Sequence, residues 1–371
     1  MLRLYNADQM KALQEQVGQL LIMGFDGAEL TPDLRQMLVT LKPGGVILFA
    51  RNIVDAPQTW ELLRACRESV DTPMFLCVDM EGGTVDRLKN AIAPAPAAAD
   101  VAATQDQKMF RTHGSLIGKE VRALGFNTDF APVLDLSFAG SRSVLTSRTV
   151  SDNPRQAVVY AREFLKGLHE ASVLGCGKHF PGLGEANLDT HKTLPLISKS
   201  WTRLWAEDLY PYRALRREMA FVMVAHAAYP AVTKTGIPAS LSEKWITEIL
   251  RRRIGYRGLV VSDDLEMGGV QAAAPIDEAA IETLRAGADM FLVCHNEAHV
   301  WRAYEAVVRE AEHDKKFARR VAAAARRVLG FKKRSKELKT NSSLPSADMV
   351  RRLRDQMQKF ADQVQHTAVM L

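Results

Sequence analysis

The motifs Lys178–Gly182 and Asp189–His191 together place a cation, two imidazoles and a carboxylate in one loop that Gly and Pro interrupt. It follows a short apolar run and reads KHFPGLGEANLDTH. Asp189 can hold one nitrogen of the His191 imidazole, which fixes the tautomer and leaves the other nitrogen free for proton transfer. The alternative interpretation is a salt-bridged surface loop. The segment is therefore a candidate acid/base site.

Two other motifs carry carboxylates at the ends of apolar runs. The first is VVSDDLEM, where Asp263 follows a strand-like run and would be held rigidly, as a nucleophile requires. Adjacent strand residues point to opposite sides, so only one of Asp263 and Asp264 can easily face a barrel axis. The second is VDMEGGTVDR, in which Asp79 and Arg87 could grip neighbouring sugar hydroxyls. An internal ion pair between Asp79 and Arg87 is the alternative.

The elements that must position these residues alternate between strands and helices. Each apolar run ends at a polar or glycine-marked turn, and amphipathic stretches of helical length, such as 58–70, 153–171, 201–219, 243–254, 277–286 and 299–312, separate the runs. Nearly continuous hydrophobicity is typical of parallel strands buried on both faces. The eight predicted strands are 19–25, 45–49, 74–79, 127–135, 174–179, 221–226, 259–263 and 289–294. We predict an α/β fold, a (β/α)8 TIM barrel. The first strand is the weakest, because 9–21 could run on as one helix.

Polar side chains stand at or just past the C-terminal ends of six predicted strands. They are Asp79, Asp135, Lys178 with His179, His226, Asp263 with Asp264, and His295 with Asn296. In a barrel these ends converge on the face that holds the active site. Capping of the following helix is the alternative role for any single Asp or Asn.

Composition sets the class of protein. The chain has 371 residues, of which 47% are hydrophobic and 25% charged, which is typical of a globular protein. No run approaches the roughly 20 apolar residues of a membrane span, and 1–10 lacks the pattern of a signal peptide. The four cysteines show no metal-ligand spacing, and three lie in strand-like runs, so we expect a reducing, cytoplasmic location.

Charge divides the chain into two parts. Residues 331–371 hold nine Lys or Arg and four Asp or Glu, a charge of +5, and the remaining residues carry only +1 of the total of +6. A nearly neutral body is not typical of a nucleic-acid-binding fold. We predict a single catalytic barrel domain over 1–331 and a basic linker with an amphipathic helix over 332–371. The tail could touch an anionic partner or be a solvated helix.

One apolar stripe runs along the predicted C-terminal helix. Met349, Leu353, Met357, Phe360 and Val364 recur at helical spacing. The helix therefore either docks on the barrel or pairs with a second copy in a homodimer. The Ala/Pro-rich segment 91–103 is expected to be a loop over the barrel rim.

Together the motifs KHFPG-x-G-x-x-x-x-DTH, SDDLEM and VDMEGG resemble the family 3 glycoside hydrolases, and within them the β-N-acetylglucosaminidases of the NagZ type. The resemblance covers roughly 18–330. It implies Asp263 as nucleophile and His191 as acid/base with Asp189 as its partner. It also implies sugar contacts from Asp79, Arg87, Arg148, Lys178 and His179. The pattern departs at Leu183, where many members carry His.

The implied reaction is two-step retaining hydrolysis that releases terminal N-acetylglucosamine, without cofactor or metal, from peptidoglycan fragments. A neutral His does not repel an anion, so a glycoside phosphorylase with the same residues is an open alternative. Asp263 and Asp264 could instead orient the acetamido group in substrate-assisted catalysis. A non-catalytic sugar-binding barrel and a metal-dependent hydrolase using His179, His191, His226 and His295 are the remaining contrasts, although metal-ligand spacing is lacking.

Overall fold

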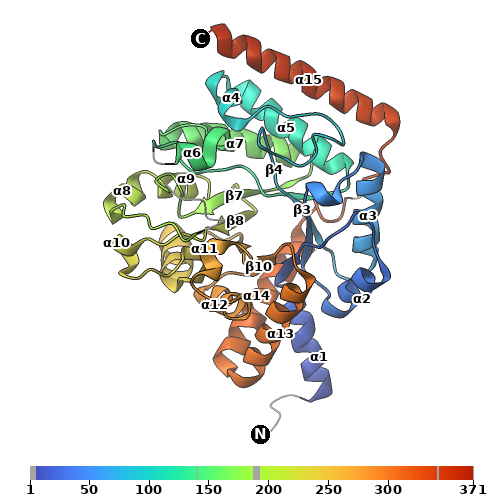
Figure 1. Ribbon diagram of the computed structural model, residues 1–371, viewed down its shortest axis with the longest axis vertical. Helices are drawn as coiled ribbons and strands as arrows, with labels where there is room; N and C mark the ends of the chain where they lie inside the picture. The colour runs from blue at the N-terminus through green and yellow to red at the C-terminus, as the bar shows by residue number, and fades with distance from the viewer. Residues whose placement is uncertain (1–5, 140, 187–192, 341, 371) are drawn as a thin grey trace.

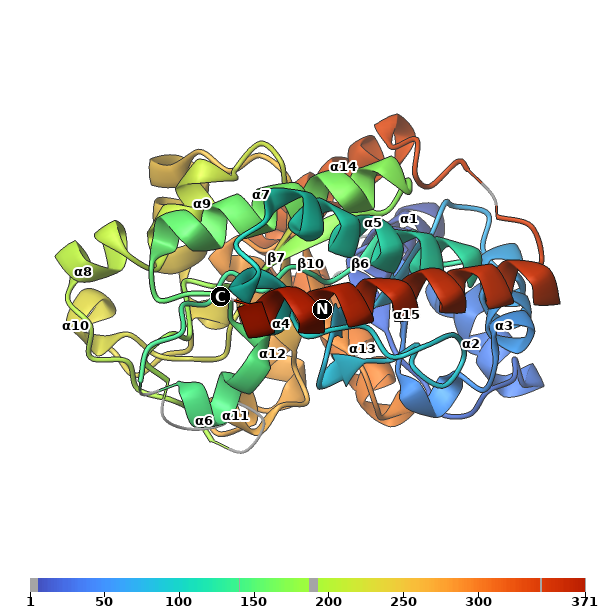
Figure 2. The same ribbon diagram turned by 90° about the horizontal axis from the view of Figure 1, so that it is seen from above.

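A closed barrel of eight parallel strands forms the centre of the molecule, and helices surround it (Figures 1 and 2). The computed structural model describes residues 6–139, 141–186, 193–340 and 342–370. The barrel strands are β1 (Leu21–Met23), β2 (Gly45–Leu48), β3 (Phe75–Val78), β6 (Thr128–Asp129), β7 (Leu174–Phe180), β8 (Phe221–Val224), β9 (Leu259–Asp264) and β10 (Met290–Val293). They follow one another around the barrel in chain order, and β10 closes it by pairing with β1. The predicted TIM barrel is confirmed.

The strands are apolar because both of their faces are covered. Every residue of β2, β3, β8 and β10 is buried, between the barrel interior and the helices. Each of the eight predicted runs overlaps one barrel strand, and β7 and β9 extend one residue beyond their predicted ends. The doubtful first strand exists, because helix α1 (Ala7–Gly18) ends before it. Gly18 packs so closely on α2 (Pro32–Leu41) that a Cβ there would lie 1.8 Å from the oxygen of Leu41.

Some of the helices that connect the strands begin at side-chain caps. Asp55 accepts a hydrogen bond at the start of α3 (Ala56–Glu68), and Asn153 does so at the start of α7 (Pro154–Glu170). The other elements are α4 (Ala98–Ala103), α5 (Gln107–Ala123), α6 (Arg142–Leu145), α10 (Pro230–Thr233), η4 (Lys244–Ile254), α11 (Gly268–Gln271), α12 (Ile276–Ala286) and α13 (Glu297–His313), with short 3-10 turns η1 (Ala50–Asn52), η2 (Thr146–Arg148) and η3 (Ala239–Leu241) and the hairpin β4 (Met80–Gly82) and β5 (Val85–Asp86).

Helix α14 (Lys315–Arg334) covers the N-terminal end of the barrel. The ring of Phe331 lies 6.1 Å from that of Phe75 and 6.1 Å from that of Phe221, the first residues of β3 and β8. Lys332 is 1% exposed and donates to the Gln19 side chain over 2.8 Å. Burial lowers the pKa of Lys332 to about 7. Because α14 extends to Arg334, the predicted basic linker begins with three residues that are still helical.

Two predictions about local structure are wrong. Segment 201–219 forms two helices, α8 (Trp201–Ala206) and α9 (Leu209–Ala214), instead of one. Pro211 explains the break, because its ring would clash with the carbonyl of Glu207 in a continuous helix. The buried Lys199 pairs with Asp208 at the break over 2.5 Å. The segment 91–103 is a loop only as far as Ala97, since the alanine-rich end forms α4 after the last proline.

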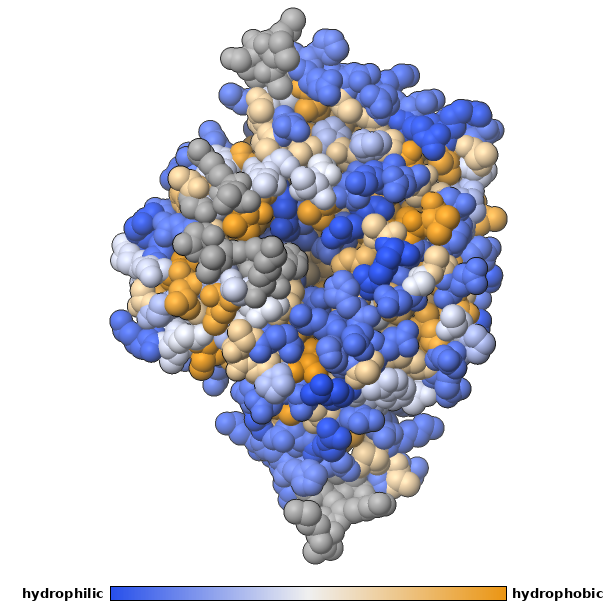
Figure 3. Space-filling view, viewed as in Figure 1, coloured by the Kyte–Doolittle hydropathy of each residue, from blue (hydrophilic) through white to orange (hydrophobic). Residues whose placement is uncertain are grey.

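The C-terminal helix α15 (Ala347–Met370) docks on its own barrel domain, along α4 and α5 (Figure 2). Of its apolar stripe, Leu353, Met357, Phe360 and Val364 are at most 8% exposed. Of the two predicted arrangements, the structure contains the docking of α15 on the barrel. Pairing with a second copy in a homodimer stays a prediction. The surface in Figure 3 is mainly hydrophilic, with hydrophobic residues in small groups. Within the described ranges, no helix is both long enough and apolar enough to cross a bilayer.

Candidate active site

A pocket of about 430 Å³ opens at the C-terminal ends of the barrel strands. Its lining includes six residues predicted from the sequence to act on substrate: Asp79, Arg87, Arg148, Lys178, His179 and Asp263. The fold brings them together from β3, β5 and its following turn, η2, β7 and β9. The other two predicted residues, Asp189 and His191, lie outside the described residues. The described part of the predicted site is thus one pocket.

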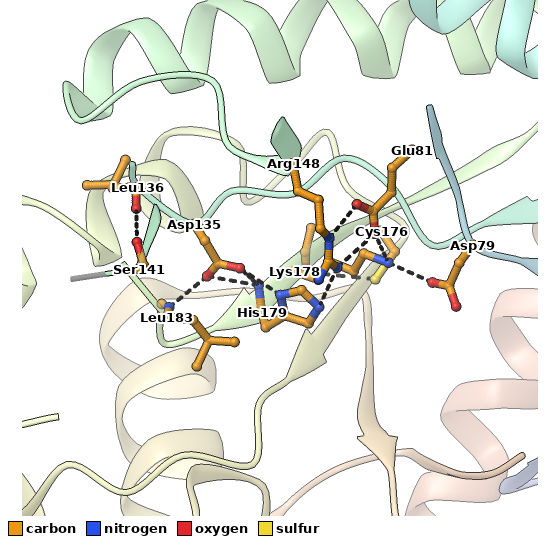
Figure 4. Close-up of polar contacts among 12 residues, drawn as sticks. Asp79, Glu81, Asp135, Leu136, Ser141, Arg148, Cys176, Lys178, His179 and Leu183 are labelled. Carbon is orange, nitrogen blue, oxygen red and sulfur yellow. Dashed lines mark hydrogen bonds and ion pairs between the residues drawn. The ribbon is translucent and has the colours of Figure 1, made fainter. Parts of the chain in front are cut away.

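Lys178 is the centre of a buried ion-pair cluster in this pocket (Figure 4). Its ammonium lies 2.6 Å from Asp79 Oδ1 and 2.7 Å from Glu81 Oε1, and the residue is 2% exposed. Arg148 donates to both oxygens of Glu81, over 2.8 and 2.9 Å. Burial by itself would raise the pKa of Glu81, but the charges of Arg148 and Lys178 hold it well below its ordinary value. Glu81 therefore stays ionised and fixes two cations at the pocket wall.

Asp135 orients His179 from the side opposite Arg148 (Figure 4). Asp135 Oδ2 lies 2.6 Å from His179 Nδ1, and Oδ1 accepts the backbone N–H of Leu183 over 2.7 Å. Arg148 Nη2 lies 3.4 Å from the other ring nitrogen of His179. A carboxylate on Nδ1 makes that nitrogen the donor and fixes the imidazole plane. Leu183, the departure from the family pattern, thus uses its backbone to hold Asp135.

Asp263 carries its carboxylate at the end of β9, between imidazoles and a cation. Burial by itself would raise its pKa, but the nearby His179 and His226 imidazoles, a backbone N–H and Lys178 together lower it. The N–H of Asp264 donates to Asp263 Oδ1 over 2.9 Å. The carboxylate is consequently ionised at neutral pH, the form in which it can attack carbon.

Asp264 braces the turn that follows β9. Its Oδ1 accepts the N–H of Glu266 over 3.1 Å, and its Oδ2 lies 3.4 Å from His295 Nε2. Burial raises the pKa of Asp264 to about 7. The two neighbouring Asp residues therefore differ in ionisation. Both line the pocket, because the ladder between β9 and β10 shifts register at this point.

Arg87 lines the pocket beside an aromatic ring. Its guanidinium carbon lies 5.7 Å from the centre of the Phe49 ring, and Arg87 Nε is buried without a hydrogen-bond partner. Asp79 forms its ion pair with Lys178, and the alternative ion pair between Asp79 and Arg87 is not present among the described residues. Arg87 thus lines the pocket with one buried donor that no described residue uses.

Two residues of the site were missed as site residues in the sequence. Glu81 stands inside VDMEGG, and Asp135 is predicted only as a strand end. The available signal for Glu81 was a charged residue directly before Gly82, whose φ of 84° turns the chain back sharply. Nothing in the sequence names its partners, since Arg148 is 67 residues away.

Histidines do not form a metal centre in the described part of the chain. His226 is fully buried and bonds to Ser240 Oγ over 2.7 Å and to the carbonyl of Asp264 over 2.9 Å, which occupies both ring nitrogens. Among the described residues no group of three or more His, Cys, Asp or Glu side chains is arranged to hold a metal ion.

Comparison with known proteins identifies the family to which the chain belongs. The model of the glycosyl hydrolase family 3 N-terminal domain matches residues 12–331. The chain belongs to glycoside hydrolase family 3. A β-hexosaminidase of Pseudomonas aeruginosa is 37% identical over 290 residues, which cover 78% of this chain and 86% of the relative. A second β-hexosaminidase, from Idiomarina loihiensis, is 34% identical over 282 residues, 75% of this chain and 84% of the relative.

Solved structures agree with the family 3 assignment. A family 3 β-N-acetylglucosaminidase from Paenibacillus sp. superposes with a TM-score of 0.86 at 30% identity, covering 94% of this chain and 68% of that one. NagZ of Neisseria gonorrhoeae in complex with N-trifluoroacetyl-D-glucosamine gives a TM-score of 0.76 at 30% identity, over 94% and 97% of the two chains. The predicted resemblance is confirmed, and this family 3 chain is a glycoside hydrolase.

Proposed function

We propose that the chain is a retaining, exo-acting β-N-acetylglucosaminidase that releases terminal N-acetylglucosamine from peptidoglycan fragments in the cytoplasm. The observation that carries the proposal is the ionised Asp263 at the end of β9, in a pocket walled by Asp79, Arg148 and Lys178. The β-hexosaminidase relatives and the sugar-bound NagZ support the substrate. Free thiols persist in the cytoplasm, and all four cysteines are free and buried.

In the proposed first step, Asp263 attacks the anomeric carbon through an oxocarbenium-like transition state while His191, held by Asp189, protonates the leaving oxygen. In the second step, His191 takes a proton from the water that releases the sugar. Lys178, Arg148, His179, Asp79 and Arg87 bind the sugar hydroxyls, and the carboxylates of Glu81 and Asp135 hold three of them in place. Binding by fixed groups positions the anomeric carbon at Asp263.

Hydrolysis of aryl β-glycosides tests the proposal. We expect wild-type protein to cleave the N-acetylglucosaminide in preference to the glucoside and to release free sugar. Formation of sugar 1-phosphate in phosphate buffer would indicate a phosphorylase instead. Absence of cleavage of either glycoside would reject the enzymatic proposal.

Substitution of His191 tests its assignment as the acid. His191→Ala is expected to lower kcat by on the order of 100-fold on a poor leaving group such as a sugar alcohol. With a nitrophenolate leaving group the loss should be much smaller, because this group needs little protonation. The measurement is a plot of log kcat against the pKa of the leaving group for both proteins. Equal losses across the series would contradict the role of His191.

Removal of metal ions is expected to leave activity unchanged. The proposed steps use only a carboxylate and an imidazole, and both ring nitrogens of His226 are already occupied. The measurement is kcat/KM after dialysis against a strong chelator, compared with an untreated sample. Loss of activity that Zn²⁺ restores would favour the metal-dependent alternative.

A further inference from the structure

Residues 82–97 form a loop, here called the rim loop, that borders the substrate pocket. Hydrogen bonds join the two halves of this loop. Gly83 N donates to the carbonyl of Ala95 over 2.9 Å. The carboxylate of Asp86 accepts the N–H groups of Leu88 and Ala95, over 2.9 and 2.8 Å. The loop begins directly after Glu81 and carries Arg87. A displacement of the rim loop would therefore move side chains of the pocket.

A buried imidazole supports this loop from below. His113 lies on α5, is 0% exposed, and its Nδ1 is 2.9 Å from the hydroxyl of Tyr160. A Cβ added at Gly82 would lie 2.1 Å from the carbonyl oxygen of Pro96 and 3.2 Å from His113 Nε2. The imidazole therefore lies where the two ends of the rim loop meet. Burial lowers the pKa of His113 to about 3, so the ring is neutral.

The C-terminal helix contacts both the support and the loop. Phe360 of α15 stacks on His113, with ring centres 5.8 Å apart and an angle of 24° between the planes. Arg354 Nε donates to the carbonyl of Ile92, inside the rim loop, over 2.9 Å. Figure 2 shows α15 running along α4 and α5. The helix thus backs the His113 ring and tethers the outer part of the loop.

We infer that α15 positions the substrate-binding rim loop, with Phe360 and His113 as positioning residues behind Glu81 and with Arg354 as a tether. The family match ends at residue 331, so the helix that contacts the rim loop and His113 lies beyond the matched domain. This inference rests on the proposed function, since it assigns the rim loop to sugar binding. The reaction itself stays with Asp263, and α15 acts on substrate affinity.

Kinetics of matched variants of α15 test the inference. Phe360→Ala removes the ring behind His113. Leu353→Ala removes a buried apolar side chain of the same helix that instead lines a separate surface pocket, together with Lys119 and Arg122 of α5. For Phe360→Ala we expect kcat/KM on the aryl N-acetylglucosaminide to fall by about 10-fold, mainly through a higher KM. Leu353→Ala should lower the Tm but keep KM and kcat within about twofold of wild type.

Hydrogen exchange distinguishes positioning of the rim loop from general stabilisation of the fold by α15. In Phe360→Ala, amides of the rim loop should exchange faster than in Leu353→Ala, at a temperature where both are folded. Arg354→Met removes the tether without opening a cavity, so it serves the same comparison if Phe360→Ala does not fold. Unchanged KM and rim-loop exchange in Phe360→Ala or Arg354→Met, or equal changes in Leu353→Ala, would overturn the inference. Inactive wild-type protein would refute the proposed function, whereas the exchange result would still decide the role of α15.

Discussion

Replacing Asp263 with Asn is expected to lower kcat on aryl N-acetylglucosaminides by on the order of 1,000-fold or more, because the amide cannot form the glycosyl bond to the enzyme. The substitution keeps size and shape, so the pocket should remain folded. The measurement is steady-state kinetics, together with trapping of wild type by a fluorinated sugar and mass spectrometry of the peptide that contains Asp263.

The neighbouring carboxylate supplies the matched control. Asp264 braces the turn after β9 and has a raised pKa of about 7, so an amide there resembles its protonated form. Asp264→Asn should therefore lose far less, about 10-fold. A larger loss for Asp264→Asn than for Asp263→Asn, or the absence of an adduct on Asp263 after wild type is incubated with the fluorinated sugar, would favour substrate-assisted catalysis instead.

Replacing Glu81 with Gln is expected to harm both folding and catalysis. Glu81 is 4% exposed and pairs with both Lys178 and Arg148 inside the pocket. The neutral amide leaves Arg148 without a carboxylate partner, whereas Lys178 keeps its ion pair with Asp79. Breaking a buried pair costs about 3–5 kcal/mol of unfolding free energy. We also expect kcat/KM to fall about 100-fold, because Arg148 and Lys178, the two cations proposed to bind the sugar, lose the carboxylate that they share. Denaturant unfolding and kinetics measure the two effects.

The dependence on pH has a definite sign. The folded-state pKa of Glu81 lies below its ordinary value, so its contribution to stability is present above the unfolded pKa and disappears as the pH falls through the folded pKa. The stability difference between wild type and Glu81→Gln should accordingly be full at pH 7 and shrink below about pH 4. Glu218→Gln, which breaks a half-exposed pair with Arg162, is the control and should change stability by less than about 1 kcal/mol. Equal losses of stability in the two variants would contradict a larger contribution from the buried ion pairs of Glu81.

The position of the polar residues at the ends of strands explains why so much of the pocket was predictable. Asp79, Lys178 and Asp263 each follow or end a buried apolar run, and parallel strands of a closed barrel must deliver such residues to one face. Sequence periodicity reports strands well when both faces are buried, since every residue is then apolar. It reports helices less well where a proline such as Pro211 interrupts an amphipathic pattern, as the division into α8 and α9 shows.

The sequence by itself determined the barrel and the strand-end residues Asp79, Lys178, His179 and Asp263, because local hydrophobicity and strand-end position do not depend on distant contacts. The motifs determined the family, and with it the expectation that Arg87 and Arg148 meet these residues in the pocket. Only the tertiary structure decided the partners. Glu81 with Arg148 and Asp135 with His179 are pairs of residues 67 and 44 positions apart. Such pairs produce no periodic pattern, because a sequence does not show whether a charged residue is buried or exposed. The docking of α15 was undecidable for the same reason, as an apolar stripe specifies burial but not the surface that covers it.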